Sequence, residues 1–177
     1  MNLNNFVDKK YIRIGSILLF CILFGCTVSY KFNGATIDYD KIKTISFKDF
    51  TNQAELVYAP LEYKFNEALK DSYRRQTKLK VVPQNGDLHL EGEITGYNLT
   101  SLGVTNDNFA ATSKLTMTVR VRYTNKANPR EDLNDQTFSS SATFPSSQML
   151  SDREDELTEV MVKDIVNMIF NATVANW

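Results

Sequence analysis

Two acidic and two basic side chains recur at the same spacing in different parts of the chain, and they are the residues best suited to chemistry. Glu91 and Glu93 lie two positions apart, as do Arg120 and Arg122. Paired carboxylates can act as general acid and base, and arginine can bind a phosphate through two parallel hydrogen bonds. With Lys114, the arginines could form a basic row that meets an anionic ligand. Ion pairs between the acidic and basic sets are the interpretation we favour.

Other groups that catalyse reactions or bind metals are scarce. His89 is the only histidine, and its position on the polar side of a predicted strand favours a surface role. The chain has no GxSxG, GxGxxG or Walker-type loop. The chain has no second histidine, and its two cysteines, Cys21 and Cys26, are both accounted for by the N-terminal processing that the sequence predicts. A zinc site with the usual nitrogen and sulfur ligands is therefore excluded. We therefore expect no enzyme, no metal and no cofactor.

An apolar segment close to position 1 ends at Cys26. Three basic residues precede the uncharged run 14–24, which is shorter than the roughly 20 residues that span a membrane as a helix. A basic flank, a short apolar run and Gly25 before the cysteine are typical of a secretory signal. The sequence LFGC at 23–26 resembles a bacterial lipobox, although Phe24 replaces the usual small residue. The resemblance implies cleavage before Cys26 and its acylation; an ordinary signal peptide or an uncleaved anchor is the alternative.

Processing at Cys26 predicts a signal peptide at 1–25, a lipidated tether at 26–40 and one domain at 41–177. The 152 residues from Cys26 onward carry a formal charge of −3, which argues against a nucleic-acid partner. No disulfide is expected, because Cys21 leaves with the signal and the other thiol is acylated. Two or more acyl chains would hold the protein stably on a membrane.

The elements that position Glu91 and Arg122 are predicted from their alternation. Apolar residues occupy every second position in 88–96 and again in 115–123, which indicates two half-buried strands. With a turn near 106–107, opposed residue numbers should sum to about 213, since one register must satisfy both faces. This register sets Glu93 against Arg120 and Glu91 against Arg122. It also directs Tyr97 outward, on the same face as these charges.

The remaining predicted elements are three strands and two helices. The strands occupy 41–50, 79–82 and 137–144, and the first helix begins at Pro60 and ends near Arg74 and Arg75. The last helix follows a capping-box sequence at Ser151–Glu154. Its expected core stripe consists of Leu157, Val160, Met161, Ile165, Met168, Ile169 and Ala172, widened by Val162, Val166 and Phe170.

These strands, with one helix after the first strand and the other helix last, predict a two-layer α+β domain. We expect about four strands in a largely antiparallel or mixed sheet, with both helices on one face. The other face would be rich in threonine, serine, lysine, arginine and glutamate, and would be open to water.

Four phrases in succession, taken with the LFGC sequence, resemble the LptE family of lipopolysaccharide-assembly lipoproteins, in the form found in Bacteroidetes-like bacteria. They are EALKDSYRRQTKLKVV, GDLHLEGEITGYNLT, SKLTMTVRVRYTN and IFNATVANW, within about 42–177. The resemblance implies an α+β lipoprotein of the outer membrane that is not an enzyme and plugs the large β-barrel LptD. It also implies a role in placing lipopolysaccharide in the outer leaflet. TVSY after Cys26 lacks the acidic run of surface-exported lipoproteins, so we expect a periplasm-facing protein.

Some members of that family bind lipopolysaccharide through basic residues. The candidates here, Lys114, Arg120 and Arg122, come from the strand pattern and not from the resemblance. Two other functions stay open: a lipid- or glycan-binding lipoprotein, and a pilotin-like chaperone of another outer-membrane pore. A sizeable apolar cavity between helices and sheet would favour the first of these, whereas a solid core would favour the plug.

Overall fold

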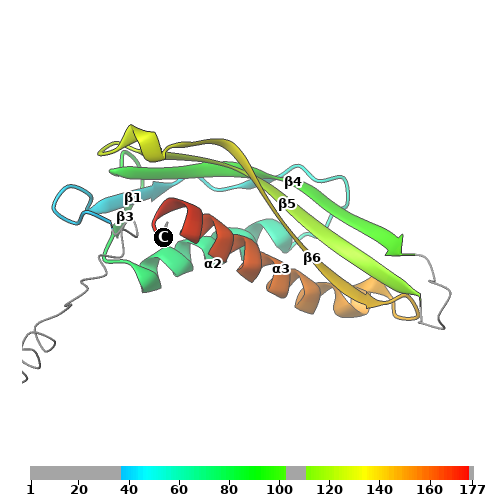
Figure 1. The fold of residues 1–177 in the computed structure, drawn as a ribbon. Coiled ribbons are helices and arrows are strands. Elements are labelled where there is room, and N and C mark those ends of the chain that lie inside the picture. Colours follow the sequence, from blue (N-terminus) through cyan, green and yellow to red (C-terminus); the bar gives the residue numbers. More distant parts are fainter. Residues whose placement is uncertain (1–36, 103–110, 176–177) are drawn as a thin grey trace, which may run out of the picture. The chain divides into compact units, whose positions relative to one another are not determined.

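The computed structural model describes residues 37–102 and 111–175, which form one sheet and two helices (Figure 1). The predicted signal peptide at 1–25 and Cys26 lie outside these residues. The elements in chain order are β1 Thr44–Phe47, β2 Thr51–Asn52, α2 Leu61–Gln76, β3 Lys80–Val82, β4 Leu88–Leu102, β5 Thr112–Asn125, the short 3-10 helix η1 Pro129–Glu131, β6 Leu133–Pro145 and α3 Leu150–Thr173. Within the described residues, neither α-helix is both long and apolar enough to cross a membrane.

The sheet is mixed and has six strands, in the order β3-β1-β4-β5-β6 with β2 beside β4. The pairs β1–β3, β1–β4 and β2–β4 are parallel, whereas β4–β5 and β5–β6 are antiparallel. The α+β class is confirmed, with more strands than the four or so predicted. One reason is that a further strand forms beyond the predicted segment 41–50. At the end of that segment Phe50 turns into the core, where Asn66 of α2 binds both its backbone N–H and its carbonyl oxygen, at 2.8 and 2.9 Å. A separate short strand, β2, follows this turn.

Both helices pack against the same face of the sheet, as predicted (Figure 1). The first helix buries Leu61, Phe65 and Leu69, which matches the spacing of its apolar residues. Aromatic contacts join the layers, since Tyr73 meets Phe47 at 5.4 Å and Phe170 at 5.2 Å, both edge to face. The core is therefore continuous from the sheet through α2 to α3.

The predicted register of β4 and β5 is confirmed over the first half of the pair. Glu91 opposes Arg122, Glu93 opposes Arg120 and Ile94 opposes Val119. Between Ile94 and Gly96 the register shifts by one residue at a β-bulge. Because an extra residue reverses every later side chain, Tyr97 is fully buried, and its predicted outward position is wrong.

The last helix differs from its prediction in two ways. It begins at Leu150, so Ser151 lies inside it; the Ser151 hydroxyl contacts Asp152, and no side chain caps the helix. The capping-box prediction is therefore wrong. Val160 is 50% exposed, although the predicted stripe included it, and Thr158 is buried in the core instead. The reason is that Tyr97, turned inward by the bulge, hydrogen-bonds the Thr158 hydroxyl at 2.9 Å.

Candidate functional site

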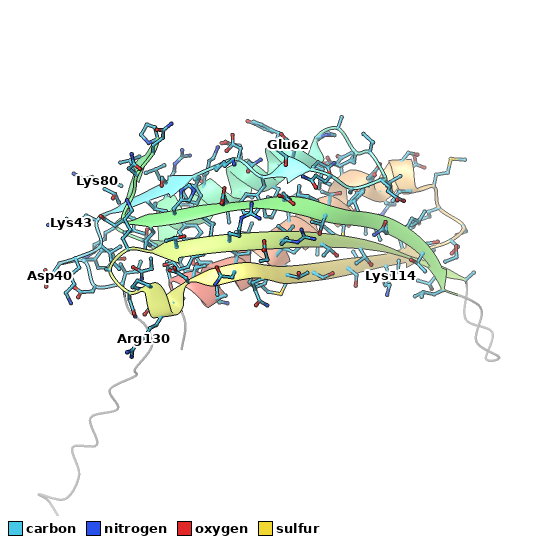
Figure 2. All side chains as sticks on the ribbon, turned by 90° about the horizontal axis from the view of Figure 1, so that it is seen from above. Asp40, Lys43, Glu62, Lys80, Lys114 and Arg130 are labelled. Carbon is cyan, nitrogen blue, oxygen red and sulfur yellow. The ribbon has the colours of Figure 1, made fainter. Side chains whose placement is uncertain are left out.

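The face of the sheet that the helices leave uncovered is polar, as predicted (Figure 2). Along β5 the side chains of this face alternate with the buried ones, and β6 continues the pattern at the sheet edge. Threonine and serine dominate the part of this face around Thr118, whose hydroxyl lies 3.2 Å from that of Ser139. We call this surface, formed by the outward side chains of β4, β5 and β6, the open face.

An ion-pair network crosses the open face and confirms that the acidic and basic sets pair. Arg122 Nε donates to Glu91 Oε1 at 3.2 Å, and Arg122 Nη2 lies 3.7 Å from Glu93 Oε1. Arg120 Nη1 lies 3.8 Å from Glu93 Oε2. The two arginines of the predicted basic row are therefore largely neutralised by the carboxylates beside them.

Two members of this network could not be predicted from the pairing of β4 with β5. Asp135 Oδ1 accepts from Arg122 Nη1 at 3.0 Å, and Lys48 Nζ lies 3.5 Å from Glu91 Oε2. Asp135 has a φ of 51°, in the left-handed region, at the irregularity where β6 leaves its regular register with β5. Lys48 comes from the segment between β1 and β2. No sequence signal joins either residue to the network, because both arrive through tertiary structure.

The electrostatics of the network favour charged side chains. The hydrogen bond from Arg122 is the largest cause that holds the pKa of Glu91 below its ordinary value, against the opposing effect of partial burial. Hydrogen bonds to Asp135 and Glu91 raise the pKa of Arg122. The centre of the open face is thus a balanced set of charges.

Lys114 lies on the open face but apart from the two arginines. It opposes Thr100 of β4 and Thr143 of β6, six positions along β5 from Arg120, or about 20 Å at the rise of a strand. Among the residues that the structure describes, no carboxylate forms an ion pair with Lys114. Lys114 is therefore the member of the predicted row whose charge is most available to an external anion.

His89 has a structural partner. Its Nδ1 lies 2.9 Å from the Ser46 hydroxyl, and that hydroxyl also accepts from the Gly86 N–H at 3.2 Å. Asp87 stabilises the neighbouring corner of the sheet, where β1 begins beside β4. Its Oδ2 accepts from the Thr44 hydroxyl at 2.8 Å and from the backbone N–H groups of Lys43 and Thr44. Within 37–102 and 111–175, no group of three or more histidine, cysteine or acidic residues could hold a metal ion.

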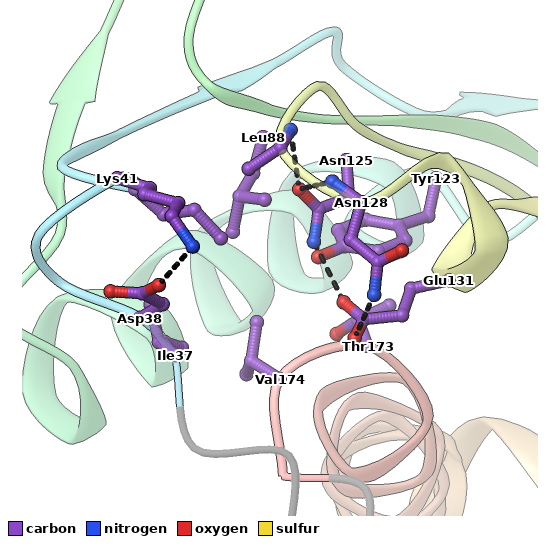
Figure 3. A pocket seen from close by; sticks show the side chains of 12 residues that line it. Ile37, Asp38, Lys41, Leu88, Tyr123, Asn125, Asn128, Glu131, Thr173 and Val174 are labelled. Atoms are coloured by element: carbon purple, nitrogen blue, oxygen red, sulfur yellow. Dashed lines mark hydrogen bonds and ion pairs between the residues drawn. The ribbon is translucent and has the colours of Figure 1, made fainter.

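Two concave regions bear on whether the helices and the sheet enclose a ligand chamber. The first, of about 270 Å³, lies at the end of the sheet beside η1 and the last turn of α3 (Figure 3). Its polar side chains are engaged: Lys41 pairs with Asp38 at 3.0 Å, and Asn125 and Asn128 each donate to Glu131 at 2.7 Å. The second, of about 570 Å³, is an outer groove between α2 and α3 that mixes charged and apolar residues. Neither is an apolar chamber between the helices and the sheet.

Comparisons with known proteins agree with this architecture. Residues 42–173 match the protein family described as LptE, lipopolysaccharide assembly. An uncharacterised lipoprotein B from Nitrosomonas europaea has a TM-score of 0.53 at 18% identity, covering 76% of this chain and 83% of its own. A minor lipoprotein from Acinetobacter baumannii has a TM-score of 0.50 at 12% identity, covering 76% and 94%. At these identities the structural matches establish the fold alone. No curated protein is significantly similar to this sequence.

Proposed function

The chain belongs to the LptE family of lipopolysaccharide-assembly lipoproteins, and from that membership we propose that it is the plug and assembly partner of a large LptD-like β-barrel in the outer membrane. Family membership makes it a lipopolysaccharide-assembly lipoprotein. The barrel partner, the outer membrane and the direct contact with lipopolysaccharide are parts of the proposal. In this role the protein binds and positions, and it is not an enzyme.

The open face is the observation that carries the proposal. Large outer-membrane barrels have polar, water-filled interiors. The part of this face around Arg120 and Arg122 presents hydroxyls and a neutralised ion-pair network, and it can lie against such a wall without desolvating an unpaired charge. The β4 strand of 15 residues gives this face a length of about 50 Å, which is greater than the thickness of a bilayer core of about 30 Å.

Lipid attachment at Cys26 is the second part of the proposal. Acylation would hold the domain beside its barrel, and a tethered partner binds at a high effective concentration without any new contact. Ile37, the first described residue, lies at the end of the sheet that also holds η1 and the end of α3 (Figure 3). The tether would therefore leave the domain at that end.

Lipopolysaccharide contact is assigned to the open face and chiefly to Lys114. Arg120 and Arg122 are engaged with Glu93 and Glu91, so an anion would have to compete with carboxylates for them. Lys114 has no such competitor among the described residues. In this proposal a phosphate group meets Lys114 first.

The solid packing of the layers favours the plug over a lipid or glycan carrier. A carrier would hold its ligand in an apolar chamber, whereas buried side chains fill the space between sheet and helices. The pilotin-like alternative, in which the protein serves another pore, differs from the plug only in its partner.

Affinity purification of the tagged full chain from detergent-extracted membranes tests the proposal. We expect one large barrel protein in equimolar amount, together with lipopolysaccharide. A photo-crosslinking residue at position 114 should capture that barrel or lipopolysaccharide, whereas one at Lys78, beyond the end of α2, serves as the control. Recovery of the chain with no barrel would overturn the proposal, and recovery with a secretion pore would favour the pilotin role.

A further inference from the structure

The edge strand β6 is unusually open to pairing. It is the last strand of the sheet, and in the described parts of the chain only β5 pairs with it. An edge strand presents unpaired backbone donors and acceptors, and proteins usually guard it with charges, prolines, bulges or short length. The opposite edge, β3, has only three residues and begins with a lysine.

Within its own sequence, the regular part of β6 has none of these four protections. From Gln136 to Phe144 it contains no charge, no proline and no glycine, and its register with β5 is unbroken from Gln136 to Pro145. Asp135 and Pro145 stand just outside the two ends of this stretch. The stretch is therefore an uncharged, regularly paired edge with a limited length.

The sequence of this edge is nearly symmetric about Ser140. Reading outward from that residue, Ser139 mirrors Ser141 and Thr137 mirrors Thr143. All four of these side chains are exposed on the open face. On the helix side, Phe138 mirrors Ala142, a large residue against a small one. An antiparallel partner with the same sequence would thus set hydroxyl against hydroxyl, which is a favourable cross-strand pairing for threonine, and would set Phe138 against the small Ala142, which leaves room for the ring.

We propose that β6 pairs with β6 of a second copy of this chain, antiparallel and with the two-fold axis at Ser140. Such an axis runs perpendicular to the sheet, so both helical layers lie on one side and the two open faces join into one polar surface. The contact is isologous, because the same edge serves both copies. It uses β-strand addition, in which main-chain hydrogen bonds supply the affinity.

One group opposes the pairing and sets its strength. The Ser140 hydroxyl donates to Asp164 Oδ2 at 3.1 Å, so Asp164 of α3 lies beside the edge. The two-fold axis brings the Asp164 carboxylates of both copies toward each other, and like charges repel. The dimer is consequently weak and reversible, and this leaves the edge available to other partners.

Cysteine mapping tests the proposal on the full chain. The chain is produced in excess over any barrel partner and oxidised mildly in detergent extracts. Opposed residues of an antiparallel pair have Cα atoms about 4.5–5.5 Å apart, which suits a disulfide. Ser140→Cys should therefore give roughly tenfold more disulfide-linked dimer than the parent chain, whose Cys21 and Cys26 set the background.

Thr137→Cys is the matched control, because each copy of it opposes Thr143 and lies about 20 Å from its own counterpart. It should stay at the parent level, whereas the double variant Thr137→Cys, Thr143→Cys should crosslink as strongly as Ser140→Cys. Equal melting temperatures of the reduced variants would verify that each folds. A Ser140→Cys yield at the parent level, or a larger yield from Thr137→Cys alone, would overturn the proposal. Neither result bears on the barrel partner, since the readout involves this chain only.

Discussion

Arg122 Nε donates a hydrogen bond to Glu91 Oε1 at 3.2 Å, across the β4–β5 pair and on the side of the sheet that faces away from the helices. The contact joins the two strands at the centre of the open face. It also decides the character of that face, because it turns a potential anion-binding arginine into one half of a neutral pair.

Replacing Arg122 should remove the hydrogen bond that lowers the pKa of Glu91. In Arg122→Gln the pKa of Glu91 should rise toward its ordinary value, because the hydrogen bond from the guanidinium is the main cause of its lowering. Carboxylate carbon shifts followed through a pH titration by NMR would measure the change. Arg75→Gln, which breaks a helix-surface pair with Asp71, is the control and should leave Glu91 as it was. An unchanged Glu91 titration in Arg122→Gln would show that other groups lower the pKa.

The corner held by Asp87 should make folding sensitive to acid. Hydrogen bonds from the Lys43 N–H and the Thr44 hydroxyl hold the pKa of Asp87 below its ordinary value. A carboxyl with a lowered folded pKa stabilises the protein above its unfolded pKa of about 3.9, and this contribution is lost as the pH falls through the lower folded value.

Asp87→Asn should therefore cost about 1 kcal/mol of unfolding free energy at pH 7, and the difference from wild type should shrink below about pH 4. Urea unfolding at pH 7 and pH 3 would measure both effects. Glu159→Gln, at an exposed site on α3, serves as the control and should change neither value. A wild-type advantage that stayed constant between the two pH values would contradict the assigned role.

Gly92 should tolerate no side chain. A Cβ built there would lie 2.1 Å from the Arg120 carbonyl oxygen and 2.4 Å from Phe50 Cε1. Gly92→Ala should thus lower the unfolding free energy by about 3 kcal/mol, as overpacked cores do. Gly96→Ala is a matched control in the same strand, because its Cβ would meet Thr118 Cβ at 3.2 Å, which a small shift can relieve. Comparable urea midpoints for the two variants would be inconsistent with this packing.

The inward turn of Tyr97 predicts a cost for losing its hydroxyl. That hydroxyl lies 2.9 Å from the Thr158 hydroxyl and donates to Glu154 at 3.2 Å. Tyr97→Phe should lower the unfolding free energy by about 1 kcal/mol, since it leaves a buried hydroxyl without its partner. Tyr63→Phe, at a position 72% exposed, should have no measurable effect in the same thermal unfolding assay. A stable Tyr97→Phe protein would indicate that the bulge does not depend on this contact.

Lipidation should matter for assembly and not for folding. In Cys26→Ser we expect an unchanged unfolding midpoint of the domain and a loss of roughly tenfold to hundredfold in barrel recovered with it, because anchoring raises the effective concentration. Quantitative mass spectrometry of purified complexes would measure the recovery. The same substitution at Cys21 is the control, since that residue would leave with the signal peptide. Wild-type recovery from a Cys26→Ser strain would count against the anchor.

Much of the fold follows from the sequence, because the direction of a strand side chain is a local property. Alternation was enough to predict which residues are buried in β5 and in β4 as far as the bulge, and the need for both faces to agree predicted Glu91 opposite Arg122. The spacing of apolar residues likewise predicted the first helix and its buried side. These features require knowledge of the chain only within and between two neighbouring segments.

Only the tertiary structure decided the positions where distant segments meet. The bulge that turns Tyr97 inward is supported by Thr158 of α3, and it reverses the parity that local alternation predicts. Asp135 and Lys48 reach the open-face network from an irregular part of the edge strand and from a loop. Their spacing in the sequence therefore does not predict that they join it. Val160 faces outward because the sheet and α2 together determine which side of α3 is covered. Local periodicity fixes a side chain relative to its own element, whereas burial and charge pairing depend on which other elements pack against it.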